Sequence, residues 1–223
     1  MTKWAFLSYF LNVSTPMYGN EASFHTKYLK SIKKGDSCNT SLWNFSNHTG
    51  THIDCPYHFS ENGKKISDYS PEFWVINNCE FIDVNVNPGD IISSNHITLD
   101  TIDADIELLI IKTNFYRLRE NKAYWQNNPG LHPDIADILR NNFKKLRMIG
   151  MDFISVSSFQ NRLMGREAHK TFLNHDLQPI LLIEDMNLSS IESNSKIIHL
   201  FIAPLLVENA DASPCTIIAE VMI

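Results

Sequence analysis

The chain reads His48-Thr49-Gly50-Thr51-His52-Ile53-Asp54-Cys55-Pro56-Tyr57-His58 at its most informative stretch. Three histidines and one aspartate fall within eleven residues. The β-branched residues, the glycine and the proline between them disfavour a helix, so we expect an extended segment. In an extended segment, alternate side chains project to one face, and all four ligand-type residues have even numbers. They are His48, His52, Asp54 and His58.

Three neutral imidazoles and a carboxylate on one face form a good site for zinc or a similar divalent ion. Gly50 would leave space between the first two ligands for an ion, a water or a substrate carbonyl. Cys55 has an odd number, so its thiol should point away from the ligands. The alternative is a chance cluster of histidines on a solvated loop, but four ligand types in phase favour a metal site.

A metal site also needs ligands from elsewhere in the chain. Glu184 ends the apolar run 180–183, and a carboxylate beside buried strand residues is costly unless it is paired or metal-bound. His169 lies in a predicted helix, residues 166–174, and is preferred over its rival His175. The other histidines are expected to be ordinary surface, cap or core residues: His25, His96, His132 and His199.

Apolar runs alternate with helical patterns along the chain, without a repeat or a linker. The expected helices are 133–146, where apolar residues follow helical spacing after Pro133, and 166–174. Residues 24–34 are expected to form a short helix or an irregular arm. Extended or strand segments are expected at 4–13, 41–48, 51–54, 73–76, 81–84, 108–112, 147–152, 180–184, 196–202 and 217–221. This pattern predicts one α/β domain, residues 1–223, around a mixed sheet.

The composition narrows the classes of partner. The net charge is −6 without a concentrated basic block, which disfavours nucleic acids and polyanionic membranes. No apolar run is long enough to cross a bilayer. The four cysteines include no C-x-x-C pair, so we expect free thiols in a reducing compartment.

The apolar N-terminal run 4–11 could be a short secretory signal. It lacks a small-x-small cleavage site, so we expect a strand there. A glycosylation sequon at Asn47 would also place a glycan directly beside His48 in a eukaryotic secreted protein. We therefore expect a cytoplasmic protein.

The motif H-x-G-T-H-x-D-x-P-x-H resembles the signature of the cyclase-like metal-dependent hydrolase superfamily, which includes bacterial kynurenine formamidase, isatin hydrolase and cyclases. Every fixed position is present, and the resemblance covers nearly the whole chain. The further segments that carry it are 14–19, 111–113, 128–131, 149–156, 168–169 and 183–184.

The resemblance implies a swivelling β/β/α domain, a central mixed sheet flanked by helices, and a homodimer. It implies that His48, His52 and Asp54 hold a first metal. Asp54 would bridge to a second metal, which His169 and Glu184 also hold, and His58 would be the catalytic acid/base. Two features depart from the family pattern. Ser157 stands where many relatives carry aspartate, and the interval between His169 and Glu184 is longer than in kynurenine formamidases.

Three functions are consistent with these residues. The first is an arylformamidase, in which metal-bound hydroxide hydrolyses N-formylkynurenine to kynurenine and formate. The second is a hydrolase or cyclase acting on a cyclic amide or lactone, as isatin hydrolase does. The third is a metal-holding protein without turnover, against which His58 argues, because a purely structural site needs no proton shuttle.

The metal we expect is zinc, with manganese as the alternative, as one or two ions. The expected partner is a small substrate, which could be aromatic. Aromatic residues near the motif could line an aryl pocket or could equally be core residues: Trp43, Phe45, Phe59, Tyr69 and Trp74.

Overall fold

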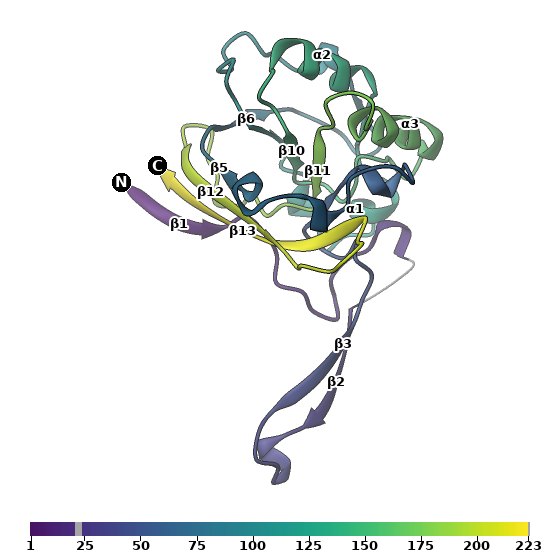
Figure 1. Ribbon diagram of the computed structural model, residues 1–223, viewed down its shortest axis with the longest axis vertical. Helices are drawn as coiled ribbons and strands as arrows, with labels where there is room; N and C mark the ends of the chain where they lie inside the picture. The colour runs from purple at the N-terminus through teal and green to yellow at the C-terminus, as the bar shows by residue number, and fades with distance from the viewer. Residues whose placement is uncertain (21–23, 223) are drawn as a thin grey trace.

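The computed structural model describes residues 1–20 and 24–222 (Figure 1). A nine-stranded sheet has the order β5-β12-β13-β4-β11-β10-β8-β6, and β1 also pairs with β13. Its strands are β1 Thr2–Phe6, β4 His52–Asp54, β5 Val75–Ile76, β6 Cys79–Asp83, β8 Leu108–Lys112, β10 Met148–Met151, β11 Leu181–Glu184, β12 Lys196–Pro204 and β13 Ala212–Met222.

The parallel half of the sheet consists of β6, β8, β10 and β11. Residues 108–112 and 148–151 are buried throughout, which is typical of parallel strands covered on both faces. Leu109 and Ile111 pack into the core beneath the helices, whereas Leu108 and Ile110 pack into a second core on the opposite face. The helices on the first face are α2 Asp134–Asn142 and α3 Arg162–Phe172 (Figure 1).

The second core is covered by the antiparallel half of the sheet, formed by β1, β12, β13 and β5. Buried and exposed residues alternate along β12, as expected for a strand with one face on a core. The helices, the parallel strands and the antiparallel strands thus form three layers. This arrangement confirms the predicted α/β domain with a mixed sheet in a β/β/α fold.

A hairpin projects away from these layers (Figure 1). It consists of β2 His25–Lys30 and β3 Thr40–Asn44, and every residue of β2 is exposed. The prediction of a short helix or an irregular arm at 24–34 was therefore wrong: most of this segment is a regular strand, because cross-strand hydrogen bonds to β3 satisfy its backbone. Only Ile32–Lys34 turns helically, as a 3₁₀ segment before Gly35, whose φ is +94°.

Helix boundaries differ from the expected ones by several residues. Helix α2 ends at Asn142, four residues before the predicted end, although the apolar residues Phe143 and Leu146 of the predicted helix are buried. Helix α3 begins at Arg162, four residues earlier than expected. Strand β1 occupies only part of the predicted segment 4–13.

The smaller elements are α1 Ala123–Gln126, the strand pair β7 Ile91–Ile92 and β9 Gly130–Leu131, and 3₁₀ segments at Tyr18–Asn20, Pro56–His58, Ile66–Asp68, Pro71–Trp74, Ser94–His96 and Phe115–Leu118. Within the described ranges, no helix is long and apolar enough to cross a bilayer.

Candidate functional site

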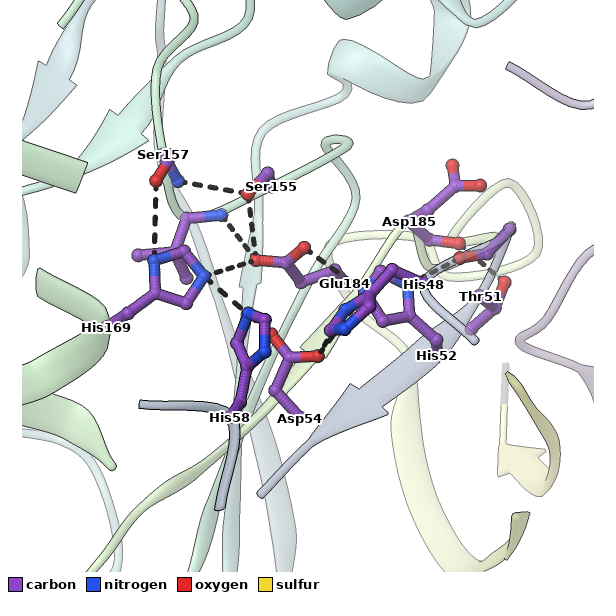
Figure 2. A network of polar contacts seen from close by, with 12 residues as sticks. His48, Thr51, His52, Asp54, His58, Ser155, Ser157, His169, Glu184 and Asp185 are labelled. Carbon is purple, nitrogen blue, oxygen red and sulfur yellow. Dashed lines mark hydrogen bonds and ion pairs between the residues drawn. The ribbon is translucent and has the colours of Figure 1, made fainter. Parts of the chain in front are cut away.

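The motif is not one continuous strand. Only His52–Asp54 forms a strand, the chain turns at Gly50 with φ +66°, and Pro56–His58 is a 3₁₀ turn. The expectation that alternation alone aligns the four side chains was therefore wrong for His48 and His58. The two turns bring them to the side already occupied by His52 and Asp54 (Figure 2).

Gly50 lines the pocket beside the ligands and also has a role in the backbone. A side chain there would clash with Leu11, and the positive φ is readily available only to glycine. The Gly50 carbonyl lies 2.8 Å from Nδ1 of His52, which carries the proton in this contact. Gly50 therefore orients His52 and leaves its Nε2 free to act as a ligand.

Three adjacent strands form the floor of the site. Strand β4 pairs antiparallel with β11 on one side, where Glu184 lies opposite His52. On its other side it pairs with β13, where Ala212 lies opposite Asp54. Cys55 points away into the second core, as predicted, and its thiol donates to the Asp211 carbonyl at 2.9 Å.

Asp54 lies at the centre of the imidazoles. Its Oδ1 is 3.0 Å from Nδ1 of His48 and 3.5 Å from Nε2 of His52. Its Oδ2 is 3.7 Å from Nε2 of His169. The two carboxylate oxygens therefore face different imidazoles.

Glu184 has the same two-sided arrangement. Its Oε2 lies 3.4 Å from Nε2 of His52, and its Oε1 lies 3.4 Å from Nε2 of His169. The Ser155 hydroxyl and the Val156 amide donate to Oε1 at 3.1 and 2.7 Å (Figure 2). These donors hold the carboxylate in place at the end of β11.

His169 reaches the site from helix α3. Its Nδ1 donates to the Gly165 carbonyl at 2.8 Å and lies 3.3 Å from the Ser157 hydroxyl, so Nε2 faces the carboxylates. A side chain at Gly165 would collide with Ser157, so glycine permits this close packing. The rival His175 is absent from this cluster and pairs instead with Asp176.

Asp211 is a residue that sequence reasoning missed. Its Oδ2 lies 2.8 Å from Nδ1 of His58 and 3.2 Å from Nε2 of His48. Hydrogen bonds from these two rings hold the pKa of Asp211 well below its usual range. Burial alone would lower the pKa of His48, but the hydrogen bond to Asp211 and the negative charge of Asp54 raise it to about 10.

The donor set fits a divalent cation. Nε2 of His52 and both carboxylate oxygens of Asp54 are buried without a hydrogen-bond partner. Unsatisfied buried polar atoms are costly, and coordination to a cation would satisfy them. Two groups of ligand atoms lie close enough to share an ion: His48, Asp54 and His58, and His52, Asp54 and Glu184.

A pocket of about 290 Å³ opens above these groups. Its walls include Pro16, Tyr18, Phe59 and Ile154. Of the five aromatic residues predicted as pocket candidates, only Phe59 lines it. Tyr69 and Trp74 pack in or against the second core, and Trp43 and Phe45 lie at the base of the hairpin.

Sequence reasoning also missed the hydrogen bonds that hold the chain directly after Glu184. The next residue, Asp185, has φ +53° and accepts two hydrogen bonds from Arg119 at 2.9 and 2.7 Å. The Tyr124 hydroxyl donates to it at 2.6 Å. No sequence signal pairs these residues, because 61 or more positions separate them.

Comparison with known proteins identifies the family. The sequence profile of the family described as "Putative cyclase" matches residues 6–158, which include the whole histidine motif. The chain belongs to this cyclase family. The match ends before His169, Glu184 and Asp211, so the family profile does not cover the second half of the site.

Known relatives align with almost the whole chain. The chain is 28% identical to kynurenine formamidase from Bacillus anthracis, over 96% of this chain and 95% of the relative. It is 27% identical to the kynurenine formamidase of Bacillus cereus, with the same coverage.

Solved structures show the same fold. Isatin hydrolase A from Labrenzia aggregata superimposes with a TM-score of 0.78, at 18% identity, over 98% of this chain and 93% of that one. A structure described as a potential metal-dependent hydrolase with cyclase activity superimposes with a TM-score of 0.76, at 22% identity, over 99% of this chain and 98% of that one.

Proposed function

We propose that this chain is a metal-dependent hydrolase that cleaves a carbon–nitrogen bond of a small aryl amide, as an arylformamidase does. The observation that carries this proposal is the position of Asp54. Its carboxylate is buried without a hydrogen-bond partner and is surrounded by three imidazoles and Glu184. The full-length similarity to kynurenine formamidases supports N-formylkynurenine as the substrate, with kynurenine and formate as products.

The metal ligands would be His48, His52, Asp54, His169 and Glu184. A divalent ion there would lower the pKa of a bound water to about 7 and would polarise the substrate carbonyl. Asp54 and Glu184 each face imidazoles with both oxygens, which supports two ions rather than one. The nitrogen and oxygen ligands suit zinc, with manganese as the alternative.

His58 is the proposed acid/base. Asp211 accepts the proton-bearing Nδ1, so Nε2 is available to the pocket. Nε2 would take a proton from the water whose oxygen adds to the formyl carbon. It would then give that proton to the amide nitrogen as the carbon–nitrogen bond breaks, releasing formate and an aryl amine.

The walls of the pocket suit an aryl ring. Phe59 stacks on the His169 ring with centroids 5.0 Å apart and an interplanar angle of 25°. Together with Ile154 and Tyr18, it surrounds the ligands with apolar surface. An aromatic substrate with its formamide directed at the floor would bury its ring against these residues.

A direct comparison of substrates tests this function. Purified protein loaded with zinc, and separately with manganese, is assayed spectrophotometrically on N-formylkynurenine and on isatin. We expect turnover of N-formylkynurenine and its loss in His58→Ala at near-normal metal content. Turnover of isatin alone would favour the cyclic-amide alternative, and turnover of neither at full metal content would favour a non-catalytic metal protein.

We also propose a homodimer built through the hairpin. Tyr28, Leu29, Leu42 and Trp43 on its strands are all more than half exposed. An isolated two-stranded hairpin is marginally stable in water, so exposed apolar residues on it indicate a partner surface. A second copy supplies the same surface by symmetry.

The four free thiols support a reducing, cytoplasmic location.

A further inference from the structure

Two arginines lie on the helix that supplies His169. Arg162 and Arg166 precede His169 by seven and three residues, so all three lie on one face of α3. Both side chains line the pocket that contains the proposed metal ligands. The face of α3 that places the His169 imidazole at the floor of the pocket therefore also places the two guanidinium groups at its wall.

Aromatic neighbours hold the first of these guanidinium groups. Arg162 lies over the ring of Phe159, 4.0 Å from its centroid, and 6.0 Å from the centroid of Tyr18. Burial raises the pKa of the Tyr18 hydroxyl, and the charges of Arg162 and Arg166 oppose that rise. Both guanidinium groups are thus close to Tyr18, which is itself part of the pocket wall.

Three of the four other arginines of the chain have acidic partners, and the fourth, Arg117, is exposed beside Tyr116 and outside this pocket. Arg119 pairs with Asp185, Arg140 with Asp137 and Arg147 with Glu107. Among residues 1–20 and 24–222, no carboxylate lies within 4.0 Å of either Arg162 or Arg166. In the described part of the chain, both guanidinium groups therefore remain available to a ligand.

Guanidinium groups recognise carboxylates through paired, charge-assisted hydrogen bonds. Asp54 and Glu184 on the floor are already directed at imidazoles, and Asp185 is paired with Arg119. The rest of the lining is apolar apart from the imidazoles and the hydroxyls of Tyr18, Ser155 and Ser157. Building on the proposed hydrolase function, we propose that Arg162 and Arg166 form a subsite for a carboxylate of the substrate. The substrate class is then an aryl amide that carries an anionic group, rather than a neutral aryl amide.

Helix geometry indicates where this carboxylate lies. At about 1.5 Å per residue, Arg166 and Arg162 lie about 4.5 and 10.5 Å from His169 along the axis of α3. The bound carboxylate is therefore several ångströms from the ligands, at the end of the substrate remote from the reacting amide. N-formylkynurenine has this layout, because its carboxylate ends a side chain attached to the ring beside the formamide and lies several bonds away from it.

The test compares N-formylkynurenine with its carboxamide, which lacks only the negative charge. For the wild type, we expect a KM for the carboxamide about ten-fold higher or more. Arg166→Ala and Arg162→Ala should each raise the KM for N-formylkynurenine about five-fold or more and leave that for the carboxamide within about two-fold. Both residues are exposed and alanine favours helices, so the variants should fold.

Arg117→Ala is the matched control, because Arg117 is exposed and stacks on Tyr116 but does not line this pocket. It should leave both KM values unchanged. Arg166→Glu should reverse the preference in favour of the carboxamide. Equal KM values for the two substrates in the wild type, or equal effects of the arginine variants on both, would overturn the subsite.

A binding measurement separates this proposal from the proposed function. Calorimetry with kynurenine and kynurenine amide on metal-loaded protein requires no turnover. Preferential binding of kynurenine that Arg166→Ala abolishes would support the subsite even if no substrate were hydrolysed. Turnover without such a preference would leave the hydrolase standing and remove the subsite.

Discussion

Oδ2 of Asp211 accepts a hydrogen bond from Nδ1 of His58 at 2.8 Å, although 153 positions separate the two residues. The contact exists because β13 begins beside the end of β4, where the Cys55 amide donates to the Asp211 carbonyl. A carboxylate on one ring nitrogen determines the tautomer and leaves the other nitrogen to exchange protons. Asp211 therefore positions the proposed acid/base.

The first prediction concerns this contact. Asp211→Asn should lower kcat about 100-fold and change KM little, because an amide can present N–H to Nδ1 and favour the wrong tautomer. Asp211→Glu, which keeps the carboxylate, should recover part of the activity. Steady-state kinetics and metal analysis on the same preparations check this, with Glu208→Gln, an exposed acid in the same loop, as the control. If Asp211→Asn instead loses bound metal along with its activity, the role of Asp211 would be to hold the proposed ligand His48 in place.

The second prediction distinguishes the two candidate histidines of the distal half. His169→Ala should lose one of two bound metal ions and should lower the melting temperature, because bound metal stabilises the folded state. His175→Ala should keep both ions, since His175 faces Asp176 on the surface. Metal content by mass spectrometry and thermal unfolding, with and without chelator, check this. The reverse result would assign the ligand to His175.

The third prediction concerns Asp152, which lies outside the metal cluster. Burial raises its pKa to about 6, despite hydrogen bonds from Thr113, and its Oδ2 is buried without a partner. The folded state therefore binds a proton more tightly than the unfolded state. This contribution to stability is complete below about pH 4 and is lost as the pH rises through about 6.

Asp152→Asn should remove that pH dependence. Relative to the variant, the wild type should lose about 1 to 3 kcal/mol of unfolding free energy between about pH 4 and 7. Urea unfolding of both proteins in chelator, at several pH values, measures the difference. A difference that does not change with pH would show that Asp152 is charged throughout this range.

The fourth prediction concerns the hairpin. Replacing Tyr28 and Trp43 by serine should shift a dimer toward monomer, because both side chains are exposed on the arm and would be buried between copies. Analytical ultracentrifugation across a concentration series measures the shift. Lys145→Ala, at an exposed lysine outside the hairpin, is the control and should leave the association unchanged. A wild type that is monomeric at every concentration would contradict the proposed homodimer.

Most of the fold could be predicted from the sequence because apolar periodicity reflects burial. The runs at 108–112, 148–151 and 181–184 are strands, as expected. Strand β2 of the hairpin was missed because an exposed strand has no apolar periodicity, and its backbone pairing to β3 is invisible in the local sequence. Strand β3 itself lies largely within the predicted extended segment 41–48. The boundaries of α2 and α3 shifted because apolar residues such as Phe143 can be buried without being helical.

The sequence by itself determined the family and the residue types of the site. Spacing within eleven residues sufficed to connect His48, His52, Asp54 and His58, because local turns keep neighbours in sequence close in space. The tertiary structure decided how they converge, at Gly50 and at the 3₁₀ turn, and which distant groups join them. Asp211 and the Arg119–Asp185 pair depend on the packing of distant segments, and no local pattern encodes contacts over such separations. The two arginines share the helix face of His169, but only the docking of α3 brings that face to the pocket. The metal motif can therefore be identified from the order of the residues, whereas the proton-transfer partner Asp211 and the wall of the substrate pocket are properties of the folded chain.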